Sequence, residues 1–271
     1  MKFPRLPLTR EHGSWAVLAV PLAVGTASSV QVRWEHAALA IAAMAAFLSH
    51  VPIRVILEHV AGRRRDDALL RGARWWAPIL VGVALALTSV LVLRGATFLL
   101  SCVLIGGATL AVRSTLQRSG KRSSLGDLFA VAGLSLGAPA AFALGSGGMK
   151  DSAFILWVEM FLFFGCTVVY VHMKIRAAAQ KLHAFSVRDR IQFGWVTLAY
   201  HVAVMAIVAV VVSAQRTPVL ALAAYLPMSI HAVVGTIRLT GAVQFKRLGF
   251  MLLAHSAAFG ALLVWAWKGA V

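Results

Sequence analysis

The chain has 271 residues, of which 60% are apolar and 13% are charged, and its mean hydropathy is +0.83. A soluble domain carries about 25% charged residues, so the composition excludes an ordinary soluble protein. The formal net charge of +17 would suit a nucleic-acid-binding protein. The basic residues, however, lie on short segments between long apolar runs, so we expect no nucleic-acid partner.

Nine apolar stretches of about 18 to 25 residues follow one another along the chain. They cover residues 14–32, 36–53, 75–93, 95–112, 128–149, 152–173, 191–215, 217–237 and 248–267. A helix of roughly 20 residues crosses a hydrocarbon core of about 30 Å. Because a spanning segment must pair its own backbone polar groups, each stretch should be helical. We predict an all-α, polytopic membrane protein with nine transmembrane helices, residues 1–271 forming a single domain.

The basic residues predict how the chain is oriented. Twenty-one of the 26 lysines and arginines precede the first stretch or lie in every second gap after it, and five lie on the other side. Basic residues gather on the cytoplasmic side of membrane proteins. The N-terminus and the long gaps after the second and sixth stretches should therefore be cytoplasmic, and we expect a bacterial cytoplasmic membrane.

Two features of the gaps and stretches carry structural expectations. The fourth stretch contains Gly106 and Gly107 and the fifth contains Pro139, so both should pack centrally, because small residues allow close helix approach. Residues 54–74 are able to form a separate amphipathic helix at the membrane surface. The alternative is a plain topology determinant that touches anionic lipid headgroups.

Glu11 and His12 stand directly before the first stretch, in the sequence REHGSW. A pure interfacial anchor would need Arg10 and Trp15 but not the carboxylate and imidazole between them. We therefore take Glu11 and His12 as candidate acid–base residues, and the anchor as the alternative.

Histidines are unusually frequent in the cytoplasmic half of the predicted helices. They are His50, His172, His201, His231 and His255, and His12 lies at the same side. Each alone is explained by an interhelical hydrogen bond, whereas a neutral imidazole can also bind a metal or relay protons. Their clustering predicts a polar cavity open to the cytoplasm, with His201 as a further catalytic candidate.

Cationic side chains accompany these histidines at helical spacing. Tyr170 and Lys174 share a helix face, because residues four apart are neighbours on a helix. The complete set of candidate binding residues is His50, Arg54, Lys121, Arg122, Tyr170, His172, Lys174 and Arg176. Arginine, lysine, histidine and tyrosine converging at a membrane boundary suit a phosphate or diphosphate headgroup.

Two acidic residues need separate interpretations. Asp127 opens the fifth stretch, where a carboxylate can cap a helix N-terminus. Glu159 lies inside an apolar run, and an ionisable group there faces the bundle interior or a wet cavity. It is either a structural hydrogen-bonding group or a station on a proton path.

The opening REHGSWAVL at residues 10–18, followed by VPL at residues 20–22, resembles YwiC-like membrane proteins. The resemblance extends through FLSHVP at residues 47–52 and a basic segment after it. It covers the architecture of the whole chain and implies a multi-pass membrane protein.

More distantly, the plan is similar to that of UbiA-type prenyltransferases, which have nine membrane helices and long cytoplasmic loops after helices two and six. The segment LQRSGKR at residues 116–122 is loosely similar to their Lys-Arg segment. Their two aspartate-rich motifs bind magnesium and diphosphate, but the corresponding gaps here offer Glu58, Asp66 and Asp67, and then Asp189. Magnesium is thus a conceivable cofactor, but no residue is assigned to a metal.

Three functional hypotheses remain open. The first is a lipid-binding membrane protein or UbiA-like transferase that holds an isoprenoid phosphate or diphosphate in a cytoplasm-facing cavity, with membrane lipid as its surroundings. The second is a proton-coupled transporter or flippase of a small anion or lipid, with Glu159 as an outer station. The third is a haem- or metal-binding protein with opposed imidazoles on two helices.

Overall fold

The computed structural model describes residue 6 and residues 12–63, 66–117, 123–180 and 186–269. Glu11, Lys121 and Arg122 lie outside the described residues. His12 is described only as the first residue of a helix.

The described residues form ten α-helices. They are α1 (His12–Ser28), α2 (Trp34–Val60), α3 (Asp67–Leu93), α4 (Phe98–Leu116), α5 (Ser124–Leu134), α6 (Gly137–Ser146), α7 (Asp151–Ala179), α8 (Val187–Ser213), α9 (Ala221–Ile237) and α10 (Phe245–Lys268). Every apolar stretch in the sequence falls in a helix, which confirms the all-helical class. The fifth stretch is divided between α5 and α6.

Seven helical segments among the described residues are long and apolar enough to cross a membrane. They are α2, α3, α4, the α5–α6 pair, α7, α8 and α10. The apolar helices α1 and α9 are shorter, at 17 residues each. The structure thus supports a multi-pass membrane protein and gives two fewer candidate crossings than the sequence predicts.

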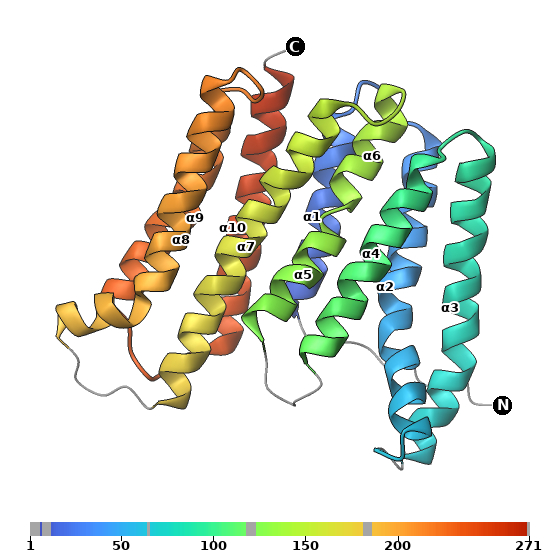
Figure 1. The fold of residues 1–271 in the computed structure, drawn as a ribbon, viewed down its shortest axis with the longest axis horizontal. Helices are drawn as coiled ribbons and strands as arrows, with labels where there is room; N and C mark the ends of the chain where they lie inside the picture. Colours follow the sequence, from blue (N-terminus) through green and yellow to red (C-terminus); the bar gives the residue numbers. More distant parts are fainter. Residues whose placement is uncertain (1–5, 7–11, 64–65, 118–122, 181–185, 270–271) are drawn as a thin grey trace.

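The helices run side by side and alternate in direction (Figure 1). One end of the bundle, here called the basic end, is where α2, α4, α7 and α9 finish and α3, α5, α8 and α10 begin. Basic residues described at this end are Arg54, Arg63, Arg71, Arg74, Arg113, Lys174, Arg176, Arg188, Arg190, Arg238, Lys246 and Arg247. The opposite end carries Arg33, Arg94, Lys150, Arg216 and Lys268.

The α5–α6 pair and α7 are central, because 56% of the apolar window of each is buried, against 11% for α4. The expectation that the fourth stretch packs centrally is therefore wrong. A Cβ added at Gly107 would meet nothing within 4 Å, so that glycine allows no close helix approach. Gly25 does so instead: a Cβ there would collide with the backbone carbonyl of Ala138, where α1 packs against α6.

The break between α5 and α6 is explained by Pro139. Proline has no backbone N–H, so it cannot complete the helical bond to the carbonyl of Ser135. That carbonyl accepts instead from the amide of Ala138, at 3.1 Å, in a tighter turn. The result is a discontinuous helix through the middle of the bundle.

Residues 54–63 and 66–74, the described part of the segment expected to form a separate amphipathic helix, form no such helix. Helix α2 continues through Pro52 to Val60, and α3 begins at Asp67. Asp66 caps α3, because its carboxylate accepts a hydrogen bond from the amide of Leu69 at 3.0 Å. The described parts of the basic segment are therefore the end of α2 with the residues up to 63 and the beginning of α3.

Candidate functional site

A cavity of about 1720 Å³ lies between α1, α2, α3, α4, α5, α6, α7 and α10. Most of its wall is aliphatic and aromatic. Its histidine and charged lining residues lie at the basic end: His50, Arg113, Asp127, His172 and Lys246. From there the wall continues along α4 to Leu99 and along α3 to Leu93, near the opposite end of the bundle.

The cavity is open at its side. Leu85 of α3, together with Leu100 and Val103 of α4, lines the cavity while remaining 61%, 52% and 55% exposed. Residues that face both a cavity and the outer surface of an apolar bundle form an opening toward lipid.

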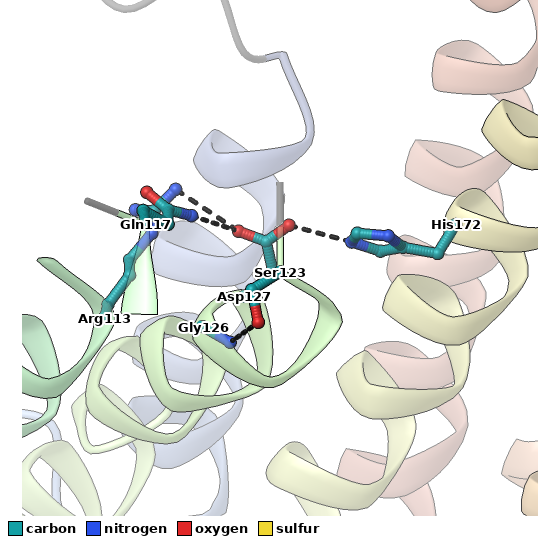
Figure 2. A network of polar contacts seen from close by, with 6 residues as sticks. All are labelled: Arg113, Gln117, Ser123, Gly126, Asp127 and His172. Atoms are coloured by element: carbon teal, nitrogen blue, oxygen red, sulfur yellow. Dashed lines mark hydrogen bonds and ion pairs between the residues drawn. The ribbon is translucent and has the colours of Figure 1, made fainter. Parts of the chain in front are cut away.

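Asp127 is the centre of a polar network at the basic end of the cavity (Figure 2). Its Oδ2 accepts a hydrogen bond from Nε2 of His172 on α7, at 2.9 Å. Its Oδ1 accepts from Nε2 of Gln117, at 3.2 Å, and from a guanidinium nitrogen of Arg113, at 3.4 Å, both at the end of α4. One carboxylate on α5 therefore joins three helices.

The interpretation of Asp127 as a helix cap is wrong. Ser123 caps α5, since its hydroxyl accepts from the amide of Gly126 at 3.3 Å. This cap places Asp127 one turn inside the helix, where its side chain reaches sideways to α4 and α7. The side chains of Arg113, Asp127 and His172 are 20%, 25% and 15% exposed, so the network is shielded but not sealed.

The histidines do not share one cavity, contrary to the sequence-based expectation. His50 and His172 line the cavity. His231 and His255 lie in a second group, on α9 and α10, with their ring centroids 4.8 Å apart. The sequence shows how far along its helix each histidine lies. It does not show which neighbouring helix the side chain faces, and this difference separates the two groups.

Tyr170 and Lys174 belong to this second group. The Tyr170 ring lies 5.2 Å from the His231 ring, and the Lys174 ammonium lies 5.3 Å from the Tyr170 ring. Lys174 also donates a hydrogen bond to the backbone oxygen of Gly235 at 2.8 Å. These contacts hold α7, α9 and α10 together, away from the residues that line the cavity.

The remaining described candidates are also dispersed. Arg54 is exposed and pairs with Glu58 at 3.7 Å, one turn along α2. Arg176 is exposed, and its guanidinium lies 4.9 Å from the ring centroid of Phe193. His201 is buried in α8, where Nδ1 donates to the backbone oxygen of Thr197 at 2.8 Å. None of these three lines the cavity.

Glu159 occupies a different site, toward the opposite end. It is 2% exposed, and its two carboxylate oxygens accept hydrogen bonds from Thr217, at 2.7 Å, and from the indole of Trp267, at 3.0 Å. Tyr225 donates to the backbone oxygen of Glu159 at 2.9 Å. The carboxylate thus ties α7 to α10 and to the turn before α9, the backbone oxygen of Glu159 adds the contact with α9, and the residue does not line the cavity.

Sequence reasoning missed Arg113, Gln117 and Lys246 as site residues. A signal was present for the first two, because they are four residues apart and so share one face of α4. Asp127, whose carboxylate both residues contact, is interpreted from the sequence as a cap of its own helix. Its distance in sequence from His172, 45 residues, could be bridged only by knowing how α5 packs on α7.

The described residues contain no group of three or more histidine, cysteine or acidic side chains placed to bind a metal ion. In the part of the cavity that the structure describes, Asp127 is the acidic lining residue, and its oxygens are occupied by cationic and amide donors. Magnesium prefers several oxygen ligands in octahedral geometry. The described donor set therefore fits an anion better than this cation.

Comparison with known protein families identifies the N-terminal part of the chain. Residues 8–142 match the family model described as YwiC-like protein. Over these residues the chain is YwiC-like. No curated protein and no solved structure matches the chain. The YwiC-like segment supplies Arg113 and Asp127, and α7, beyond it, supplies His172, so the network joins the two parts of the chain.

Proposed function

We propose that this multi-pass protein crosses the membrane nine times, with the basic end in the cytoplasm, and binds an isoprenoid phosphate or diphosphate. Adding α1 and α9 to the seven longer segments gives the nine crossings. The excess of basic residues at one end supports a cytoplasmic location for that end. This distribution of charge is suited to a protein of the bacterial cytoplasmic membrane.

The observation that carries the proposal is the polarity of the cavity along its length. Between Leu99 and Arg113 the wall follows α4 for about 21 Å at 1.5 Å per residue. On α4 this wall is apolar up to Arg113, while Thr88 and Ser89 contribute hydroxyl groups on α3. Arg113, Asp127, His172 and Lys246 line the basic end. An apolar tail several isoprene units long, with an anionic headgroup, is complementary to such a cavity.

The headgroup class follows from the donors. Guanidinium and ammonium groups bind phosphate oxygens through charge-assisted hydrogen bonds, and guanidinium can do so through two at once. The side opening between α3 and α4 would admit a ligand that is already dissolved in the bilayer. Binding is the function best supported. Transfer of the isoprenoid group is a narrower proposal, in which the cations at the basic end would stabilise a departing diphosphate.

The test is direct binding to purified protein in lipid nanodiscs. Farnesyl phosphate and farnesyl diphosphate should bind, whereas farnesol, which has the same tail without the phosphate, should bind at least about tenfold more weakly, a difference of about 1.4 kcal/mol. Arg113→Gln and Lys246→Gln should each reduce binding of the phosphate. Mass spectrometry of co-purified lipids would identify the natural ligand.

Arg54→Gln is the matched control, because Arg54 is also at the basic end but points outward and pairs with Glu58. It should leave binding unchanged. Equal affinity for farnesol and farnesyl phosphate, or equal losses from Arg54→Gln and Arg113→Gln, would contradict the proposal. Thermal unfolding of each variant checks that a loss of binding is not a loss of fold.

A transporter or flippase is the second candidate, favoured by the discontinuous α5–α6 helix. Broken helices next to a central cavity are characteristic of transporter binding sites. Glu159, the outer station that this function would use, is buried and does not line the cavity. Movement of a fluorescent isoprenoid phosphate between the leaflets of reconstituted vesicles would distinguish this function from binding alone.

A further inference from the structure

Asp127 already occupies the donors that an anionic headgroup would need. Its two oxygens take hydrogen bonds from His172, Gln117 and Arg113, and all of these contacts lie at the basic end of the cavity. Two oxygens of a phosphate in the same place could accept hydrogen bonds from the same groups as the two carboxylate oxygens do. The carboxylate is thus a resident anion within the binding site.

The cavity location distinguishes this ion pair from another one in the protein. Asp151 and Arg216 form a pair at 3.2 Å at the opposite end, where their side chains are 87% and 61% exposed. That pair touches water and lines no described cavity. A shielded pair on a cavity wall interacts more strongly and is less screened by salt than an exposed pair.

The two ends of α5, the helix that carries Asp127, make different kinds of contact with neighbouring helices. Helix α5 has 11 residues and ends at the break that Pro139 imposes. Near the break, the indole of Trp157 on α7 donates to the backbone oxygen of Ala132 at 3.0 Å. Toward the basic end, the side chain of Asp127 bonds α5 to Arg113 and Gln117 of α4 and to His172 of α7 (Figure 2).

We propose that Asp127 is an internal counter-ion that the ligand's headgroup displaces. Phosphate oxygens take over the donors of Arg113 and His172, and the carboxylate turns away with the first turns of α5. Release of Asp127 removes a link between α4, α5 and α7, so headgroup binding loosens the basic end of α5. This inference rests on the proposed function, because it describes how the same site accepts its ligand.

Displacement has a consequence for which ligands bind. A headgroup must compete with a carboxylate that is already in place, so a group with more negative charge competes better. Wild-type protein should therefore prefer a diphosphate to a phosphate, and removal of the carboxylate charge should reduce this preference. A lipid headgroup and free inorganic phosphate share the donor set but differ in the tail, so inorganic phosphate is a useful competitor.

The first experiment compares wild type, Asp127→Asn and Asp151→Asn for binding of farnesyl phosphate and inorganic phosphate in nanodiscs. We expect Asp127→Asn to bind farnesyl phosphate about tenfold more tightly, which corresponds to about 1.4 kcal/mol. Its melting temperature without ligand should fall, because Arg113 loses its counter-ion and His172 loses its carboxylate acceptor, and ligand should raise that temperature by more than in wild type. Asp151→Asn should change neither quantity.

The second experiment needs no stable Asp127 variant. Wild-type protein with ¹⁵N-labelled histidine reports the bond from His172 Nε2, assigned by comparison with His172→Asn. Farnesyl phosphate should shift that signal to a value distinct from the unliganded one, while farnesol leaves it in place. The His231 and His255 signals serve as internal controls, since both residues lie away from the cavity lining.

The outcomes separate this inference from the proposed function. If wild-type protein binds farnesyl phosphate and Asp127→Asn binds it equally or more weakly, the displacement proposal is contradicted and the proposed ligand class is not. An unmoved His172 signal on binding would also overturn it. If neither wild type nor Asp127→Asn binds, both proposals fail. Tighter binding of inorganic phosphate alone would assign the site to the free anion, with displacement retained and the isoprenoid ligand rejected.

Discussion

Asp127 and Glu159 are two carboxylates in one helical bundle, and they are held in opposite ways. Glu159 is 2% exposed and accepts its side-chain hydrogen bonds from the neutral donors of Thr217 and Trp267. Asp127 is 25% exposed at its side chain and accepts from Arg113, Gln117 and His172. Glu159 lies among packed side chains, whereas Asp127 lies on a cavity wall.

The difference suggests how to tell a structural carboxylate from an exchangeable one. Neutral donors packed around a buried carboxylate should not bind a second anion, because there is no space for that anion and no positive charge to attract it. Cationic donors on a cavity wall would bind any anion that enters. A carboxylate therefore stabilises the packing of the bundle at Glu159. On our proposal, the carboxylate of Asp127 lies instead in the binding site.

The largest expected effect is on stability, from Glu159→Ala. The substitution leaves the buried donors of Thr217 and Trp267 without acceptors and opens a void, so unfolding should become easier by about 3 kcal/mol. Denaturant titration in mixed micelles measures this change. Glu159→Gln, which keeps an acceptor oxygen, should cost less. Protein that remains folded should bind farnesyl phosphate as wild type does; altered affinity would place Glu159 in the binding function.

Double-mutant cycles sharpen the comparison. The coupling energy between Asp127→Asn and Arg113→Gln should be about 1 to 2 kcal/mol and should fall as salt rises, because the pair is charged and partly exposed. The coupling between Glu159→Gln and Thr217→Val should be about 0.6 kcal/mol, typical of polar contacts between membrane helices. It should not depend on salt. Equal salt dependence of the two cycles would contradict the distinction.

Tyr225→Phe should have a smaller effect. It removes the hydroxyl that donates to the backbone oxygen of Glu159 and leaves the ring packing intact. We expect a loss of stability of about 1 kcal/mol and no change in ligand affinity. The same unfolding and binding measurements test both parts, and a larger loss than that from Glu159→Ala would reverse the assigned importance of the two groups.

Asp151→Asn should have the smallest effect. Its ion pair with Arg216 is exposed on both sides, so the change in stability should stay below about 0.5 kcal/mol. This variant shows what the loss of an acidic charge does when the carboxylate neither fills a core nor lines a cavity. A loss comparable to that from Asp127→Asn would remove the basis for treating the cavity pair as special.

The helices were predictable because apolar length is a direct consequence of the bilayer. Each apolar stretch is mainly helical, although the fifth is divided between α5 and α6 and the extent of other helices differs: α2 runs on to Val60, and α3 begins at Asp67. The break at Pro139 was less predictable, because proline inside a helix can also be accommodated without interruption, as at Pro52 in α2. Central packing could not be judged from small residues alone, since Gly107 has no close neighbour.

The candidate site was predictable only in its chemistry and its end of the bundle. The basic end follows from the sequence, and so does the depth of His50 and His172 at that end. The separation of His231 from His172 does not, because a rotation of one helix about its axis sends a side chain to a different neighbour. The bond between Asp127 and His172 likewise depends on which helices touch, and one sequence carries no record of that.

The short helix α9 has a consequence for the surrounding lipid. Its 17 residues extend over about 26 Å, against about 30 Å for a typical hydrocarbon layer. Helix α1 is as short but is largely enclosed, whereas α9 exposes Ile230 and Val233 on its outer side. On the nine-crossing topology, local thinning of the bilayer beside α9, snorkelling of flanking side chains or association with another molecule would relieve this mismatch of about 4 Å.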